Sequence, residues 1–128
     1  MRFFLRKHNR LSREKDISSL FSNGNSLFVY PIKMIYCVSD LLDDNATFKV
    51  MTVVSKRNFK KAVKRNLLKR RLREVFRLNA YRFFDVIPSG KRVDIALVYV
   101  SKDIFESKDI EKAELELFEK LKIKLQKL

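Results

Sequence analysis

Apolar positions recur along this 128-residue chain with two periods, one typical of helices and one typical of β-strands. The first helical segment follows Ser12, which we expect to be its N-cap, and Asn23-Gly24 predicts its end. Its apolar face has i, i+3 and i+4 spacing: Ile17, Leu20 and Phe21. A second helix is predicted from Lys61 to about Ala80, and a third from Ser107 to Leu128.

Each of the two longer helices carries a single apolar stripe. The stripe of the second helix consists of Leu68, Leu72, Val75 and Phe76. The stripe of the third consists of Ala113, Leu117, Leu121 and Leu125. Both helices are therefore expected to bury one side and expose the others.

The strand-like segments lie between these helices. Residues 32–38 alternate, with apolar side chains at Ile32, Met34, Tyr36 and Val38. Residues 46–55 and 92–100 are apolar on both faces, which predicts buried strands and a central place in the sheet for 46–55. A short extra strand is expected within 25–31, where Pro31 would interrupt a longer one.

The predicted order of elements is α-β-β-(β)-α-β-α. This order indicates an α+β fold, an α/β sandwich in which helices pack on a small mixed sheet. The length suits a single domain spanning residues 1–128. Residues 1–10 show no period and are expected to form a flexible basic arm.

Charge is concentrated in one part of the chain. The formal net charge is +14, and residues 56–77 hold eleven Lys and Arg against Glu74 alone. A solvated helix face usually mixes the two signs, so a block of like charge points to a polyanionic partner. Around the second helix, a basic stripe is predicted at neighbouring positions: Arg65, Asn66, Lys69, Arg70, Arg73 and Arg77.

Several classes of protein are disfavoured by what the sequence lacks. The lone Cys37 argues against a disulfide framework, and no apolar run reaches the ~20 residues of a membrane span, so we expect a cytoplasmic protein without a membrane partner. We also expect no catalytic or metal-ligating residue. His8 lies in the arm, Asp40, Asp43 and Asp44 suit a turn, and Asp94 suits a structural hydrogen bond.

The run from Ala62 to Arg73 resembles the signature of the bacterial ribonuclease P protein component. The matching positions are Ala62, Arg65, Asn66, Leu68, Lys69, Arg70, Leu72 and Arg73. The runs Asn9-Arg10-Leu11 and Ser55-Lys56-Arg57 are similar to the family as well. Leu67 stands where many relatives have Arg, and Asn58-Phe59-Lys60-Lys61 replaces a link that is often shorter and contains Gly.

The resemblance implies a fold similar to the second domain of ribosomal protein S5, with a left-handed βαβ crossover around the basic helix. It also implies a subunit of the ribonuclease P holoenzyme, an endoribonuclease that removes the 5′ leader of precursor tRNA. In that family the RNA subunit is the catalyst and Mg²⁺ is held by RNA, not by a protein site. The expected partners are the catalytic RNA, in a 1:1 complex, and precursor tRNA.

The resemblance further implies a cleft for the leader, because single-stranded RNA is held by stacking beside cationic groups. Its expected residues are Ile17, Phe21, Tyr36, Lys56 and Arg57. Composition alone favours an ordinary core role for the first three, whereas the resemblance favours leader contacts for Phe21 and Tyr36.

Three other classes of function stay open at this stage. A structural RNA-binding protein of ribosomal type fits the composition and the basic helix, although the signature does not favour it. A basic nucleoid protein that packs DNA would bind duplexes with little preference for a leader. A self-sufficient metal nuclease is opposed by the missing carboxylate cluster.

Overall fold

The structure is a computed structural model that describes residues 10–41 and 47–127. Its elements in chain order are α1 (Glu14–Asn23), β1 (Asn25–Val29), β2 (Ile32–Asp40), β3 (Phe48–Val54), α2 (Ala62–Asn79), α3 (Tyr81–Phe84), β4 (Lys91–Tyr99) and α4 (Ser107–Gln126). The predicted α+β class is confirmed. The predicted arm falls outside the described residues except for Arg10, which forms a β-bridge with Val50.

The four strands form one mixed sheet in the order β1-β2-β4-β3. β1 and β2 are an antiparallel hairpin, β2 and β4 are antiparallel, and β3 and β4 are parallel. Because α2 connects the two parallel strands, the expected βαβ crossover is present. Its left-handed sense and the likeness to ribosomal protein S5 stay predictions.

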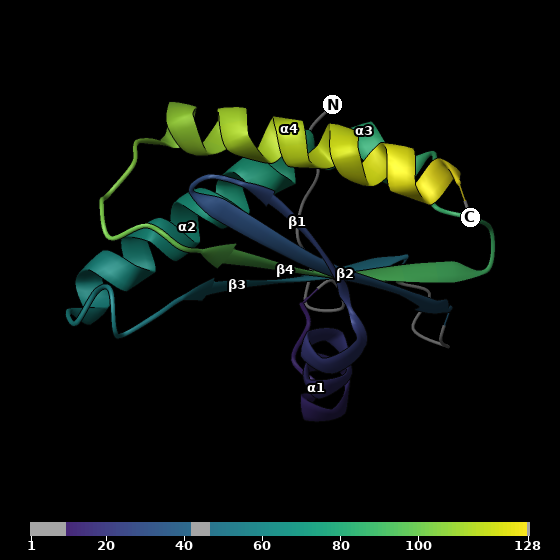
Figure 1. Ribbon diagram of the computed structural model, residues 1–128, viewed down its shortest axis with the longest axis horizontal. Coiled ribbons are helices and arrows are strands. Elements are labelled where there is room, and N and C mark those ends of the chain that lie inside the picture. The colour runs from purple at the N-terminus through teal and green to yellow at the C-terminus, as the bar shows by residue number, and fades with distance from the viewer. Residues whose placement is uncertain (1–9, 42–46, 128) are drawn as a thin grey trace.

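The sheet has helices on both sides, but unequally. Figure 1 shows α2, α3 and α4 above the sheet and α1 alone below it. The larger core lies under α2 and α4 and is centred on Phe76, whose ring lies 5.8 Å from Phe48 and 5.6 Å from Phe118 between centroids. Fully burying such a side chain contributes about 1.5–3 kcal/mol, so this layer supplies most of the stability.

A smaller core joins α1 to the other face of the sheet. Leu20 packs there with Leu11, Ile35 and Ala96. Gly24 ends α1 as predicted and lies close to β2, because a Cβ at Gly24 would lie 2.9 Å from Cγ2 of Ile35 and 3.1 Å from the Tyr36 carbonyl oxygen. Any larger residue at this position would push α1 away from the sheet.

Three sequence predictions need correction. The strand at 46–55 is not central: β3 occupies an edge of the described sheet, and its buried residues are covered by α2 and by the segment at Arg10 and Leu11. Helix α1 begins at Glu14 rather than after a Ser12 cap, with Arg13 at the N-cap position. The short α3 was not predicted, whereas the short extra strand is confirmed as β1.

Glu114 is a buried acid on α4 with a testable consequence. It is fully buried, and neither of its carboxylate oxygens has a hydrogen-bond partner among the described residues. Burial, reinforced by the nearby Glu111, raises the pKa of Glu114 well above its usual value. The folded state therefore retains a proton that the unfolded chain releases, so stability is lost as the pH rises from about 4.5 through the raised pKa.

We expect Glu114→Gln to remove this loss, because the amide does not titrate. The free energy of unfolding of the variant should exceed that of the parent by a margin that grows between pH 4.5 and pH 8. Once the pH exceeds the raised pKa of Glu114, the margin should level off at about 1.4 kcal/mol for each unit by which that pKa is raised. Denaturant unfolding at both pH values measures it, and parallel stability curves for the two proteins would contradict the assignment.

Candidate nucleic-acid interface

Helix α2 presents its apolar and cationic residues on different sides. Its buried residues are Leu68, Leu72, Val75, Phe76 and Asn79. In the predicted basic stripe, Asn66, Arg70 and Arg73 are exposed, while Arg65, Lys69 and Arg77 are partly buried. The structure therefore brings the six predicted residues together along one helix, with no hydrogen bond or ion pair engaging the side chains of Lys69, Arg70 or Arg73 among the described residues.

Arg65 has a structural task in addition to its charge. Its Nη1 atom donates hydrogen bonds to the carbonyl oxygens of Phe59 at 2.8 Å and Lys60 at 2.9 Å. These bonds fix the link that precedes α2. Arg71 is similarly engaged, because its Nη1 donates to the Phe105 carbonyl oxygen at 2.6 Å. Neither arginine can be removed without disturbing a connection.

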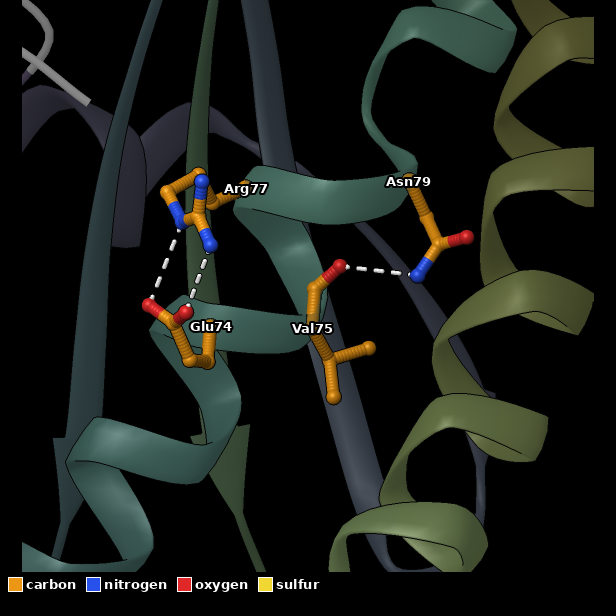
Figure 2. A network of polar contacts seen from close by, with 4 residues as sticks. All are labelled: Glu74, Val75, Arg77 and Asn79. Carbon is orange, nitrogen blue, oxygen red and sulfur yellow. Dashed lines mark hydrogen bonds and ion pairs between the residues drawn. The ribbon is translucent and has the colours of Figure 1, made fainter. Parts of the chain in front are cut away.

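The far end of α2 is held by the network in Figure 2. Arg77 pairs with Glu74 through two contacts of 2.7 and 3.2 Å, and this hydrogen bonding lowers the pKa of Glu74. Asn79 donates to the Val75 carbonyl oxygen at 3.0 Å, as Figure 2 shows. It also donates to Glu111 of α4 at 3.1 Å. Arg77 is thus the member of the basic stripe whose charge is partly neutralised within the chain.

The sheet face on the side of α1 is only partly covered. Strand pairing places Phe28, Lys33, Val98 and Val53 in one row across all four strands. This row, called the open face below, includes an exposed Lys33 and a Phe28 that is 55% exposed, while Val53 and Val98 are half-buried. It is a surface with apolar and cationic groups side by side.

Two predicted leader residues lie on the side of α1 that borders this row. Ile17 is half-buried and packs on the small core together with Val98. Phe21 follows one turn later on the same side of the helix and is 46% exposed. An ordinary core role for Phe21 is therefore wrong, because its ring is available to solvent.

Tyr36 does not lie with Phe21, and this part of the cleft prediction is wrong. Side chains alternate along β2, so Tyr36 points with Ile32 and Met34 into the larger core, while Ile35 and Cys37 face α1. Tyr36 is only 6% exposed, and burial raises its pKa. The core interpretation holds for this residue.

Lys56 and Arg57 are exposed in the turn that follows β3. Because Val53 lies near the same end of β3, these two cations stand at the end of the sheet that carries the open face. Phe28 and Lys33 were missed by sequence reasoning. Their alternation with buried neighbours gives the face on which each lies, but only the strand register reveals that they share a row.

A buried ionic cluster fixes the opposite side of α1. Arg92 contacts Asp94 at 2.9 and 3.0 Å and Asp16 of α1 at 3.6 Å. Burial raises the pKa of Asp94, and Arg92 opposes that rise. The structural hydrogen bond predicted for Asp94 is confirmed. Beside the cluster is a cavity of about 250 Å³ whose lining includes Ser19 and Cys37.

Neither a cluster of metal-ligating side chains nor a helix able to cross a membrane is found among the described residues. No group of three or more His, Cys, Asp and Glu side chains is placed there to hold a metal ion. None of the helices in the described ranges combines the length and apolar character that crossing a membrane requires. His8, Asp43 and Asp44 lie outside those ranges.

Comparison with known proteins places this arrangement in a family. The family model described as Ribonuclease P matches residues 5–122. The chain belongs to the ribonuclease P protein family. It is 34% identical over 113 residues to the ribonuclease P protein component of Porphyromonas gingivalis, covering 87% of this chain and 81% of the relative. The corresponding protein of Chlorobium phaeobacteroides is 35% identical over 104 residues, covering 75% and 71%.

Solved structures of ribonuclease P proteins have the same fold. The protein from Thermotoga maritima matches with a TM-score of 0.67 at 26% identity, covering 87% of this chain and 96% of that one. The protein from Staphylococcus aureus matches with a TM-score of 0.66 at 23% identity, covering 88% and 94%. Membership of the ribonuclease P family implies a role in tRNA processing, as a component of an endoribonuclease holoenzyme with an RNA subunit as partner.

The different positions of Tyr36 and Phe21 can be tested by stability alone. Tyr36→Ala should lower the free energy of unfolding by about 3–5 kcal/mol, because it leaves a cavity in the larger core. Phe21→Ala should cost only about 1 kcal/mol, because roughly half of its ring is already in water. Chemical denaturation of both variants measures the difference, and equal costs would contradict the two placements.

Proposed function

We propose that the chain is the subunit that binds the catalytic RNA of ribonuclease P through the basic stripe of α2. The observation that supports this best is the group formed by Lys69, Arg70 and Arg73. Their charges lie next to one another on a helix whose opposite side is buried, and none of them forms a salt bridge with a described acid, although the Arg73 charge contributes to the lowered pKa of Glu74. Arginine forks suit phosphate oxygens, and a bound polyanion relieves the repulsion among them.

The open face beside α1 is the proposed site for the 5′ leader of precursor tRNA. Phe21 and Phe28 offer exposed rings for stacking, while Lys33, Lys56 and Arg57 supply cations for the backbone. Ile17 contributes apolar surface at the base of α1 rather than a ring. Tyr36 has no part in this site.

In this proposal the chemistry belongs to the RNA. Mg²⁺ would be held by the RNA subunit and the substrate, in a 1:1 complex of protein and RNA, and would assist endonucleolytic removal of the leader. Reconstitution tests this division of labour. Adding the protein to a bacterial ribonuclease P RNA at low Mg²⁺ should stimulate cleavage of precursor tRNA. Cleavage by the protein after removal of all RNA would overturn the proposal.

Removing the unpaired part of the basic stripe should weaken assembly with the RNA. In the triple variant Lys69→Ala, Arg70→Ala and Arg73→Ala, the dependence of log K on log salt should become shallower by about 2.1–2.7, if each residue contacts one phosphate. Arg65 is left intact because it holds the link before α2. Affinity for the RNA subunit is measured across a salt series.

The matched control for this variant carries the same loss of charge elsewhere. Lys112, Lys120 and Lys124 are exposed on α4, so changing them to Ala removes three charges from another surface. If the salt slopes of the two triple variants are equal, the basic stripe is not the interface.

Phe21→Ala should separate leader binding from general affinity for RNA. Loss of one stacked base costs about 1–3 kcal/mol, or roughly 5- to 150-fold in affinity. The holoenzyme should lose this affinity for precursor tRNA and not for mature tRNA, which has no leader. Tyr81→Ala removes a partly exposed ring from α3 and is the control. Equal losses for both forms of tRNA would refute the leader assignment.

A further inference from the structure

A second cationic surface lies beyond the carboxyl ends of the parallel strands β3 and β4. The segments that leave these strands, the link before α2 and the link before α4, enclose a hollow of about 450 Å³. Its lining residues, called the lysine hollow below, are Asn58, Phe59, Lys60, Lys61, Lys64, Lys102, Asp103 and Ile104. Four lysines against one aspartate make the lining strongly positive.

The backbone of the lysine hollow is fixed, although its lysine side chains are exposed. On one side, Phe59 is buried with its ring 6.0 Å from that of Tyr99, and Arg65 holds the carbonyl groups of Phe59 and Lys60. On the other side, the Tyr99 hydroxyl donates to the Asp103 carbonyl oxygen and accepts from the Phe105 amide at 3.0 Å. Tyr99 thus contacts both the link before α2 and the link before α4, which fixes their backbones relative to each other.

The charges in the lysine hollow are not satisfied within the described chain. No described hydrogen bond or ion pair engages the side chains of Lys60, Lys61, Lys64 or Lys102. Asp103, whose carboxylate also lacks a described partner, is the one group in the lining that would repel an anion. Lysine is a compact point charge that binds phosphate without demanding a fixed geometry.

We propose that the lysine hollow binds phosphate groups of an RNA backbone, in addition to the contacts of the basic stripe and the open face. This inference rests on the proposed function. Three of its four lysines, Lys60, Lys61 and Lys64, lie in the sequence between Lys56-Arg57 and the basic stripe of α2. Two RNA molecules could supply the phosphates, the RNA subunit and the tRNA substrate.

The test uses one variant that weakens the hollow and one that strengthens it. Lys60→Ala combined with Lys102→Ala removes a cation from each link, and Asp103→Asn removes the opposing charge. Lys120→Ala combined with Lys124→Ala is the control with the same loss of charge on exposed positions of α4. Unchanged melting temperatures of the variants confirm that the fold is retained, as expected for exposed side chains.

Affinity is measured across a salt series for three RNAs: the isolated RNA subunit with the protein, and precursor and mature tRNA with the assembled holoenzyme. In one of these arms, the lysine variant should reduce the salt slope by about 1.4–1.8 more than the control, and Asp103→Asn should tighten binding. A loss in the first arm identifies the RNA subunit as the source. A loss for precursor tRNA alone identifies the leader, and a loss for both tRNAs identifies the tRNA body.

Responses equal to the control in all three arms would overturn the inference and leave the proposed function standing. Parent protein that binds none of the three RNAs would overturn both. The lysine hollow and the basic stripe are also distinguishable, because the lysine variant keeps Lys69, Arg70 and Arg73 intact.

Discussion

Burial of the apolar stripe of α2 is the interaction on which the rest of the structure depends. Leu68, Leu72 and Phe76 are fully buried between the sheet and α4, which fixes the rotation of α2 about its own axis. That rotation decides where every cation of the helix points. A helix with so many like charges is not expected to be stable in isolation, since most helical stability in proteins comes from packing an amphipathic face.

The two faces of the sheet are covered unequally, because the packing of α2 and α4 already buries one of them. One face is closed by α2 and α4, so the other needs only the small contact made by Leu20 and the close approach at Gly24. Asp16 and Arg92 anchor one side of α1 to the sheet, and Ile17 packs on the small core together with Val98 of the open face. A partly covered sheet can therefore remain stable while presenting rings and cations to solvent.

The sequence was sufficient to predict helices α1, α2 and α4 and the basic stripe, because each follows from a period along one segment, whereas the four-residue α3 was missed. It was insufficient wherever the answer depends on which segments meet. Alternation already grouped Tyr36 with Ile32 and Met34, and resemblance misassigned it to the leader cleft. The row containing Phe28 and Lys33 depends on strand register, and apolar residues on both faces of β3 did not reveal that it lies at an edge.

Some cations of the block 56–77 are engaged by ion pairs or hydrogen bonds within the fold, and the others have no such partner among the described residues. Glu74, the single acid in the block 56–77, forms an ion pair with Arg77, while Arg65 and Arg71 donate hydrogen bonds to backbone carbonyl groups. The remaining cations of this block lie on the basic stripe, around the lysine hollow and at Lys56 and Arg57, and like charges there repel one another in the free protein. A ligand that binds only the folded state stabilises it by a free energy that grows with the logarithm of the ligand concentration divided by its Kd. The same charges that repel one another in the isolated chain would therefore couple its stability to the polyanion proposed to bind them.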